Sequence, residues 1–197
     1  MASIRLAADT DAAAIAALYR PIVESTTISF ETQAPTDGEM SLRIFDTQRV
    51  LPWLACDVNG RLAGYAYASR HRLRAAYQWS VDTSVYVDDV FRRAGVATGL
   101  YTSLLAILTA QGYFNAFAGI ALPNEASVAL HERLGFEPVG IYRNVGFKLG
   151  GWHDVGWWQR PLVPPHEPAH LPIALPSMLN RADWEALLSA GVTKIRR

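Results

Sequence analysis

The chain has 197 residues, of which half are hydrophobic, and its 18 Lys and Arg residues balance its 18 Asp and Glu residues. This length suits one domain with a sizeable core. A formal net charge of zero gives no electrostatic reason to expect a nucleic acid or an anionic membrane as a partner.

The hydrophobic pattern predicts strands and helices along most of the chain. A strand over 3–6 leads to a helix that is capped near Asp9 or Thr10 and ends around Val23, and a capping box at Thr36 starts a second helix. The dipeptide 59–60, Asn-Gly, indicates a hairpin. The other expected elements are strands over 51–58, 61–69, 79–87, 113–120, 137–147 and 152–160, and helices over 98–111 and 124–134. This order predicts an α/β (α+β) fold, with one mixed, mostly antiparallel sheet flanked by helices in a single domain.

The composition changes after residue 161, which divides the chain into a domain over 1–161 and a Pro-rich extension over 162–197. The prolines of this region leave no room for a central strand or helix; they are Pro161, Pro164, Pro165, Pro168, Pro172 and Pro176. A short amphipathic helix is expected from Ala182 to Ser189, with Trp184, Leu187 and Leu188 on one face. We expect the extension to pack across the body or against a partner subunit.

Cysteine use and hydropathy favour a cytoplasmic protein. The one cysteine, Cys56, lies in an apolar run and is expected to be a buried structural thiol in a reducing compartment. No apolar run reaches the roughly 18 residues of a membrane span. Asp9 and Asp11 interrupt the alanine-rich N-terminal stretch, whose apolar residues follow helical rather than signal-peptide spacing.

A basic turn containing Gly95 joins the strand over 79–87 to the helix that follows. Free backbone N–H groups and the helix dipole make such a turn a site for phosphate or pyrophosphate. The chain has no Gly-Lys pair for a nucleotide-hydrolysing P-loop, and Gly99 stands at the wrong spacing for a dinucleotide fingerprint. The alternative is an ordinary strand-to-helix turn with two solvated arginines.

The turn and a second segment together resemble the GNAT N-acetyltransferases. The motifs are Arg92-Arg93-Ala94-Gly95-Val96-Ala97 and the segment from Asn124 to Gly135-Phe136, a helix with a good N-cap and a left-handed C-terminal glycine. Residues 26–32, 122–124 and 146–156 are similar to the phosphinothricin N-acetyltransferase branch, and the resemblance covers about residues 3–161. It implies a GNAT fold, acetyl-CoA as co-substrate, a small-molecule amine as acceptor and a homodimer, in which some of the six tryptophans would be hidden.

The resemblance also implies which residues bind acetyl-CoA. Backbone groups of Val85, Tyr86 and Val87 would hold the pantetheine arm, and an N–H there would polarise the thioester carbonyl. The valine side chains are expected to belong to the sheet core. The remaining residues that match the cofactor motifs are Arg92, Arg93, Ala94, Gly95, Val96, Ala97, Thr98, Asn124 and Ser127.

Two residues are candidates for proton transfer. Asp82 stands where the family usually has a glutamate that accepts a proton from the amine, and it is one methylene shorter. An ordinary aspartate pKa near 3.9 suits that role poorly, so Asp82 would need burial or a water relay. His131 stands where many GNAT enzymes carry a tyrosine that protonates the thiolate. The alternatives are a solvated Asp82 that caps the strand and a His131 satisfied by a backbone carbonyl.

His153 and Asp154 could suggest a catalytic pair, but neighbours on a strand point to opposite faces. We therefore expect both to be structural. No cluster of His and Cys has metal-ligand spacing, so no metal is expected.

The resemblance implies a small amino-acid acceptor of the phosphinothricin type, with a tetrahedral acidic head group; enzymes of this branch also accept methionine sulfone or methionine sulfoximine. Cations beside an apolar wall would bind it. Arg72, Arg74 and Tyr77 match the family's polar substrate-binding positions, and Phe30, Ala121 and Val155 would form the wall. The stretch 70–74 could instead be an exposed loop. The competing functions are a peptide or protein N-acetyltransferase and a non-catalytic acetyl-CoA-binding module.

Overall fold

One seven-stranded sheet forms the centre of the molecule, in a computed structural model that describes residues 1–164, 166–167 and 170–196. Its strand order is β1-β2-β3-β4-β5-β7-β6. The strands are β1 (Ala2–Leu6), β2 (Trp53–Val58), β3 (Arg61–Arg70), β4 (Ser80–Val87), β5 (Asn115–Leu122), β6 (Glu137–Lys148) and β7 (Gly151–Pro161). Within the described residues, β4 and β5 are the one parallel pair, and the other neighbouring strands are antiparallel. The predicted fold class is confirmed.

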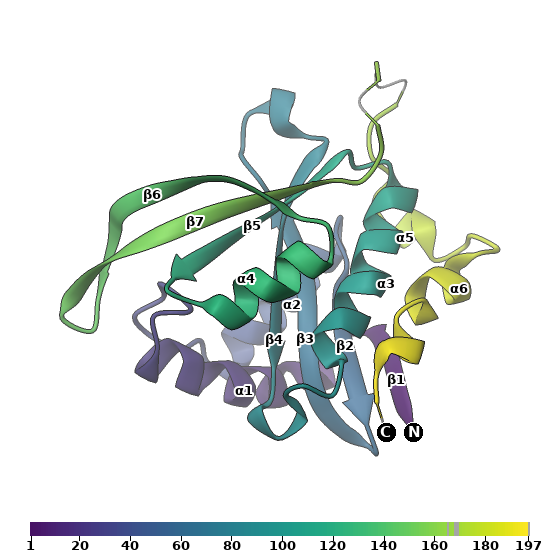
Figure 1. The fold of residues 1–197 in the computed structure, drawn as a ribbon. Helices are drawn as coiled ribbons and strands as arrows, with labels where there is room; N and C mark the ends of the chain where they lie inside the picture. Colours follow the sequence, from purple (N-terminus) through teal and green to yellow (C-terminus); the bar gives the residue numbers. More distant parts are fainter. Residues whose placement is uncertain (165, 168–169, 197) are drawn as a thin grey trace.

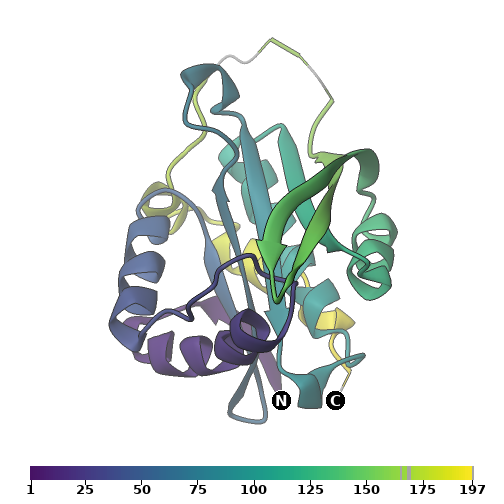
Figure 2. The same cartoon turned by 90° about the vertical axis from the view of Figure 1, so that its left-hand side faces the viewer.

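Helices cover both faces of the sheet (Figures 1 and 2). α1 (Ala12–Ser25) and α2 (Asp37–Gln48) cover one face, and α3 (Val96–Gln111) and α4 (Glu125–Arg133) lie on the other. Each face has its own core. Ile15, Tyr19 and Tyr65 belong to the core beneath α1 and α2, whereas Leu100 and Leu104 belong to the core beneath α3.

Local sequence signals explain where several elements begin and end. Thr36 and Glu39 form the predicted capping box at the start of α2. Asn59 and Gly60 both have positive φ, as the two-residue turn between β2 and β3 requires.

Cys56 in β2 is fully buried, and burial raises the pKa of its thiol to about 12. Cys56 is therefore a structural residue.

The start of α1 differs from the prediction. Asp9–Asp11 form a 3-10 turn, η1, and the α-helix begins only at Ala12. The Asp11 carboxylate accepts hydrogen bonds from the Ala8 N–H and from Arg5. The Asp11 carboxylate therefore does not cap α1 but holds the η1 turn against β1.

The C-terminal extension lies along α3 and completes the core beneath it (Figure 1). It contains a single turn, α5 (Leu175–Met178), which the sequence does not predict, the expected helix α6 (Trp184–Ser189) and a final turn, η4 (Val192–Lys194). Pro176 lies in the first turn of α5, where a missing N–H costs nothing. The buried side chains of the extension are Leu175, Met178, Trp184, Leu188 and Ile195. Pro165 and Pro168 lie outside the described residues.

No helix in the described part of the chain is both long and apolar enough to cross a membrane.

Candidate active site

β4 and β5 part in the middle of the sheet and open a pocket between them. Their parallel pairing joins Ser80–Asp82 to Asn115–Phe117 and stops there. The backbone groups of β4 that face β5 beyond Asp82 therefore have no partner strand. Half-buried Val85, Tyr86 and Val87 form the end of β4. The pocket is lined by Ile28, Thr83, Ser84, Val85, Tyr86, Tyr101, Ala118, Gly119, Ile120, Ala121, Asn124, Ser127 and His131.

Side chains at the end of β4 alternate between the two cores. Val85 and Val87 pack against the α3 core, as the sequence predicts. Tyr86 faces the other way and packs against the rings of Tyr19 and Tyr65, with centroids 4.9 and 5.3 Å away. The side chains therefore hold the strand rigidly and leave its backbone edge as the polar surface of the pocket.

The basic turn has the geometry of an anion site. Gly95 is the N-cap of α3, with φ of 84°, and Arg93 also has positive φ. The first backbone bond of the helix runs from the Gly99 N–H to the Gly95 carbonyl. The N–H groups of residues 96–98 have no acceptor among the described residues. Together with the helix dipole they can bind a phosphate group.

Arg92 and Gly95 of the turn make contacts that the sequence does not indicate. Arg92 forms an ion pair with Asp89, and both side chains are well exposed. A Cβ on Gly95 would collide with the Lys194 carbonyl oxygen of the C-terminal extension. Glycine is thus favoured here for two reasons, the left-handed φ of Gly95 and the close approach of the extension.

His131 lies in the last turn of α4, where it is 4% exposed. The cap of α4 is Asn124, whose Oδ1 accepts from the Ser127 N–H at 3.1 Å. Nδ1 of His131 lies 2.7 Å from the Ser127 carbonyl oxygen and must donate to it, because a carbonyl only accepts. Nε2 therefore accepts from the Tyr101 hydroxyl at 2.9 Å. Burial lowers the pKa of His131, so the imidazole is neutral.

Tyr101 of α3 is a site residue that no sequence motif marks. Its ring is fully buried, and its hydroxyl reaches the pocket between β4 and β5. Burial raises the pKa of Tyr101. Helical spacing could not reveal its role, because a tyrosine with a polar tip in the pocket has the same spacing as a leucine in the core.

Asp82 lies at the point where the strands part, opposite Phe117 of β5. Its Oδ1 lies 2.6 Å from Nδ1 of His71, which the sequence analysis did not select. Burial raises the pKa of Asp82, although its hydrogen bond to His71 and the charge of Arg72 act in the opposite direction. Asp82 is therefore neither fully solvated nor a simple strand cap.

The two candidates for proton transfer lie on opposite faces of the sheet, and His131 is the one that lines the pocket between β4 and β5. Side chains alternate along a strand, and Asp82 shares its face with Tyr86 above the α1 core. Thr83 points to the α3 face, where Tyr101 and His131 lie. A substrate entering from the Asp82 face could therefore meet a thioester held on the backbone edge of β4, with the Tyr101–His131 pair on the other side.

The residues expected to bind the acceptor fall into two groups. Arg72, Arg74 and Tyr77 line one pocket beyond the end of β3. The Arg72 guanidinium lies over the Trp157 ring, 5.5 Å from its centroid. In the second group, Ala121 and Val155 are register partners in β5 and β7. Arg72 and the second group share the Asp82 face. In β5, Phe117 pairs with Asp82, Gly119 pairs with Trp157 and Ala121 pairs with Val155, at steps of two residues. The pocket of Arg72, Arg74 and Tyr77 also extends to Val81, Tyr113 and Pro172 on the α3 side.

Phe30 is held near the β6–β7 hairpin by its neighbours in the loop after α1. Lys148 is buried and donates from Nζ to the Ser29 carbonyl oxygen at 2.6 Å. The Tyr19 hydroxyl lies 2.6 Å from Ser29 Oγ. The Phe30 ring packs directly on Gly146, where a Cβ would collide with it. The loop therefore forms a wall between α1 and the hairpin.

His153 and Asp154 do not contact each other's functional atoms. His153 donates to the Lys148 carbonyl oxygen, whereas Asp154 accepts from Arg143 and from the Asn144 N–H. Their structural interpretation is confirmed. Among the described residues, no three His, Cys, Asp or Glu side chains are grouped as metal ligands would be.

Comparison with known proteins supports this geometry. The family model for an acetyltransferase (GNAT) domain matches residues 4–157. The chain belongs to the GNAT acetyltransferase family. It is 42% identical to a phosphinothricin N-acetyltransferase of Streptomyces viridochromogenes over 165 residues, which cover 84% of this chain and 90% of that protein. It is 36% identical to an L-methionine sulfoximine/L-methionine sulfone acetyltransferase of Pseudomonas aeruginosa, over 83% of this chain and 96% of that protein.

A solved structure is similar over nearly its whole length. The phosphinothricin acetyltransferase of Sinorhizobium meliloti, in complex with acetyl-CoA, superimposes with a TM-score of 0.80 at 34% identity, covering 86% of this chain and 97% of that one. The family, the fold and the enzyme class expected from the sequence are confirmed: the protein is an acetyl-CoA-dependent N-acetyltransferase that acts on small substrates.

Proposed function

We propose that the protein transfers the acetyl group of acetyl-CoA to the amino group of a small amino acid with a tetrahedral, oxygen-bearing head group. Phosphinothricin, methionine sulfone and methionine sulfoximine are the candidate acceptors. The observation that supports this most strongly is the pocket between β4 and β5. The anion site before α3 follows the end of β4 in the chain, and Arg72 lies over Trp157 on the Asp82 face of the sheet. Relatives that act on these compounds span most of the chain.

The donor site follows the edge of β4. The N–H groups of residues 96–98, with Arg92, Arg93, Ala94 and Gly95 before them, would hold the pyrophosphate. The backbone of Val85, Tyr86 and Val87 would bind the pantetheine arm and polarise the thioester carbonyl. Asn124 and Ser127 would shape the pocket near the thiol. The Tyr101 hydroxyl, which donates to Nε2 of neutral His131 in the resting site, would turn from that nitrogen to give its proton to the departing thiolate.

The acceptor site lies on the Asp82 face. Asp82 would help to remove the proton of the substrate ammonium, because an ammonium cannot attack a carbonyl carbon. Arg72, Arg74 and Tyr77 would donate hydrogen bonds to the oxygens of the head group, and the bonds from the two arginines are charge-assisted. Phe30, Ala121 and Val155 would form the apolar wall.

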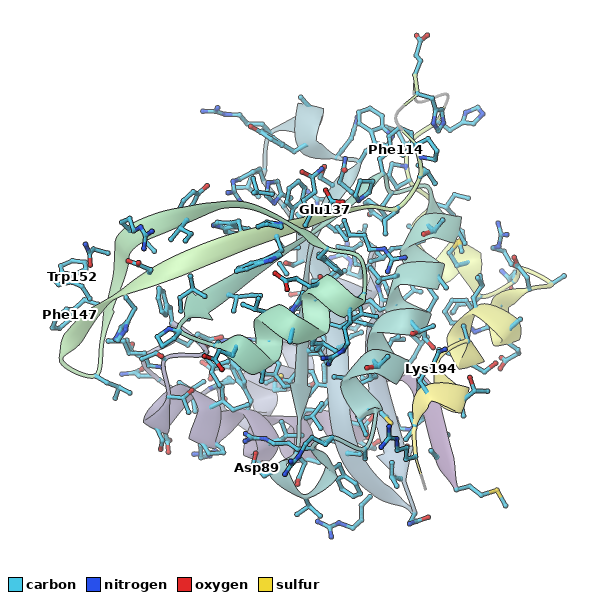
Figure 3. All side chains as sticks on the ribbon, in the orientation of Figure 1. Asp89, Phe114, Glu137, Phe147, Trp152 and Lys194 are labelled. Atoms are coloured by element: carbon cyan, nitrogen blue, oxygen red, sulfur yellow. The ribbon has the colours of Figure 1, made fainter. Side chains whose placement is uncertain are left out.

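A homodimer is the assembly we propose. The β6–β7 hairpin extends away from the body, and its apolar side chains, Val139, Ile141, Tyr142, Val145, Phe147, Leu149 and Trp152, are 44–63% exposed (Figures 1 and 3). Exposed apolar side chains gathered on one projecting element are typical of a surface that contacts a partner. We assign the catalytic unit to residues 1–161 and the extension to 162–197. A cytoplasmic location fits a chain whose one cysteine, Cys56, is buried and has no second cysteine with which to pair.

A panel of amines tests the proposed function. With acetyl-CoA in excess, thiol release should be fast with phosphinothricin or methionine sulfone and slow with glutamate and with a basic peptide. Glutamate is the control because its head group is acidic but planar. Release that is fastest with the basic peptide would contradict the proposal, as would a protein that acetylates none of these amines.

A further inference from the structure

His71 and Asp82 form a side-chain pair at the point where β4 and β5 part. Nδ1 of His71 lies 2.6 Å from Oδ1 of Asp82, and the two side chains are 12% and 26% exposed. The β3–β4 register explains the contact. Ser69 of β3 pairs with Asp82, and His71 directly follows Arg70, the last residue of β3. The pair is therefore built into the sheet rather than formed by two mobile surface groups.

Aromatic rings fix the orientation of the imidazole. The Phe117 ring stacks on it, with centroids 4.2 Å apart and planes inclined by 18°. Trp157 and Tyr77 meet it edge-on at 6.0 and 5.9 Å. The ring cannot turn without breaking this stack. Nδ1 therefore stays on the carboxylate, and Nε2 has no hydrogen-bond partner in the part of the chain that the structure describes.

This arrangement suits proton transfer better than an isolated aspartate does. Nδ1–H donates to the carboxylate, which fixes one tautomer and leaves a lone pair on Nε2. An imidazole exchanges protons near neutral pH, whereas an ordinary aspartate does so near 3.9. The half-buried Asp82 carboxylate would stabilise an imidazolium beside it.

We propose that His71, and not Asp82 alone, takes the proton that leaves the substrate ammonium. Asp82 fixes the tautomer of His71 and stabilises the imidazolium that forms. The inference rests on the proposed acetyl transfer and names its base. It also accounts for an aspartate at a position where the family usually has the longer glutamate, because Asp82 needs to reach only His71 and not the substrate.

The step balances in protons and electrons. The ammonium gives one proton to Nε2 of His71. The neutral nitrogen then forms the C–N bond with the thioester carbonyl carbon, and the C–S bond breaks. The second amine proton passes to the thiolate, with the Tyr101–His131 pair on that side of β4. The His71 imidazolium gives its proton to water before the next turnover.

The charged and titratable groups around His71 are few. Asp82 of β4 contacts it, Arg72 follows it in the chain, and Tyr77 meets its edge. Tyr67 of β3 interacts electrostatically with Asp82. β5 and β7 present only the uncharged rings of Phe117 and Trp157. A change in the pH profile after substitution of His71 can therefore be assigned to the His71–Asp82 pair.

Substitution of His71 separates proton transfer from positioning. His71→Asn keeps an N–H donor close to the position of Nδ1 but cannot take a proton. We expect its kcat to fall by about 100-fold near pH 7, the scale of general-base catalysis, with an unchanged KM for acetyl-CoA. The loss should shrink at high pH, where the amine arrives neutral. A His71→Asn variant with the kcat and pH profile of the parent would overturn the inference.

A second measurement does not depend on activity. Nitrogen NMR shifts should show the Nδ1–H tautomer of His71 in the parent protein and lose that preference in Asp82→Asn, because the amide can also donate. An unchanged tautomer in Asp82→Asn would overturn the inference as well. A parent that binds acetyl-CoA but acetylates no amine defeats the proposed function. An active parent with a fully active His71→Asn defeats only the role of His71.

Discussion

At the scale of single residues, His131 makes stability depend on pH. Burial lowers the pKa of His131 in the folded protein, while the ordinary value near 6.5 applies to the unfolded chain. The unfolded state therefore takes up a proton first as the pH falls. The stabilising contribution of neutral His131 is complete above about pH 6.5 and is lost progressively below it.

We predict that the free energy of unfolding falls more steeply between about pH 7 and pH 5 in the parent than in a His131→Gln variant. Urea unfolding at several pH values measures this difference. Exposed His166 offers the matched control, and His166→Gln should keep the parent slope. Equal slopes for the parent and His131→Gln would show that the buried imidazole is not held neutral.

The sequence identified Asp82 and His131 but not the residues that they contact. Asp82 and His131 stand inside motifs, so their positions alone identify them. His71 becomes a partner of Asp82 only through the register of β3 and β4 and the stack on Phe117. Tyr101 reaches His131 only because α3 and α4 lie on the same face of the sheet. Contacts across 11 and 30 residues of sequence leave no local pattern.

At the scale of elements, the turn before α3 depends on Gly95. Its left-handed φ strains any residue with a side chain, and a Cβ would collide with the Lys194 carbonyl oxygen (Lys194 is labelled in Figure 3). We predict that Gly95→Ala lowers the free energy of unfolding by about 1–3 kcal/mol and weakens acetyl-CoA binding, measured by denaturant unfolding and calorimetry.

Gly38 in the first turn of α2 is the control, because nothing lies within 4 Å of the position its Cβ would take. Gly38→Ala should keep or slightly raise the stability, since alanine favours helices. Parent-like stability and affinity in Gly95→Ala would mean that the extension yields easily and that the turn does not hold the cofactor.

Elements with strong local signals were predicted well. The capping box of α2, the Asn59–Gly60 turn and the Asn124 cap of α4 each satisfy backbone groups within a few residues. The 3-10 turn at Asp9–Asp11 and the single turn α5 were missed. Both depend on distant partners, since Asp11 bonds to Arg5 of β1 and α5 buries Leu175 and Met178 in the α3 core.

At the scale of the whole molecule, the β6–β7 hairpin tests the proposed homodimer. Phe147 and Trp152 are 59% and 63% exposed, pack against each other and lie at the far end of the hairpin (Figure 3). We predict a dimer in light scattering at micromolar concentration and a monomer for the double variant Phe147→Glu, Trp152→Glu, because buried charges without partners are costly.

Leu42 on α2 is similarly exposed, at 62%, so Leu42→Glu should leave the dimer intact. A parent protein that is monomeric throughout this range would remove the dimer from the account. The sequence alone could not locate this surface, because the hairpin residues alternate as those of any half-buried strand do. Their exposure is visible only once the helices are in place.

Detection of the reaction products tests the central claim most directly. Purified protein should convert phosphinothricin or methionine sulfone with acetyl-CoA into the N-acetylated amine, and the amount of this product should equal the amount of free CoA thiol released. Mass spectrometry of the amine together with a thiol assay measures both. Thiol released without N-acetylated product would mean simple thioester hydrolysis. No turnover of either amine by a protein that binds acetyl-CoA would contradict the proposed acceptor class.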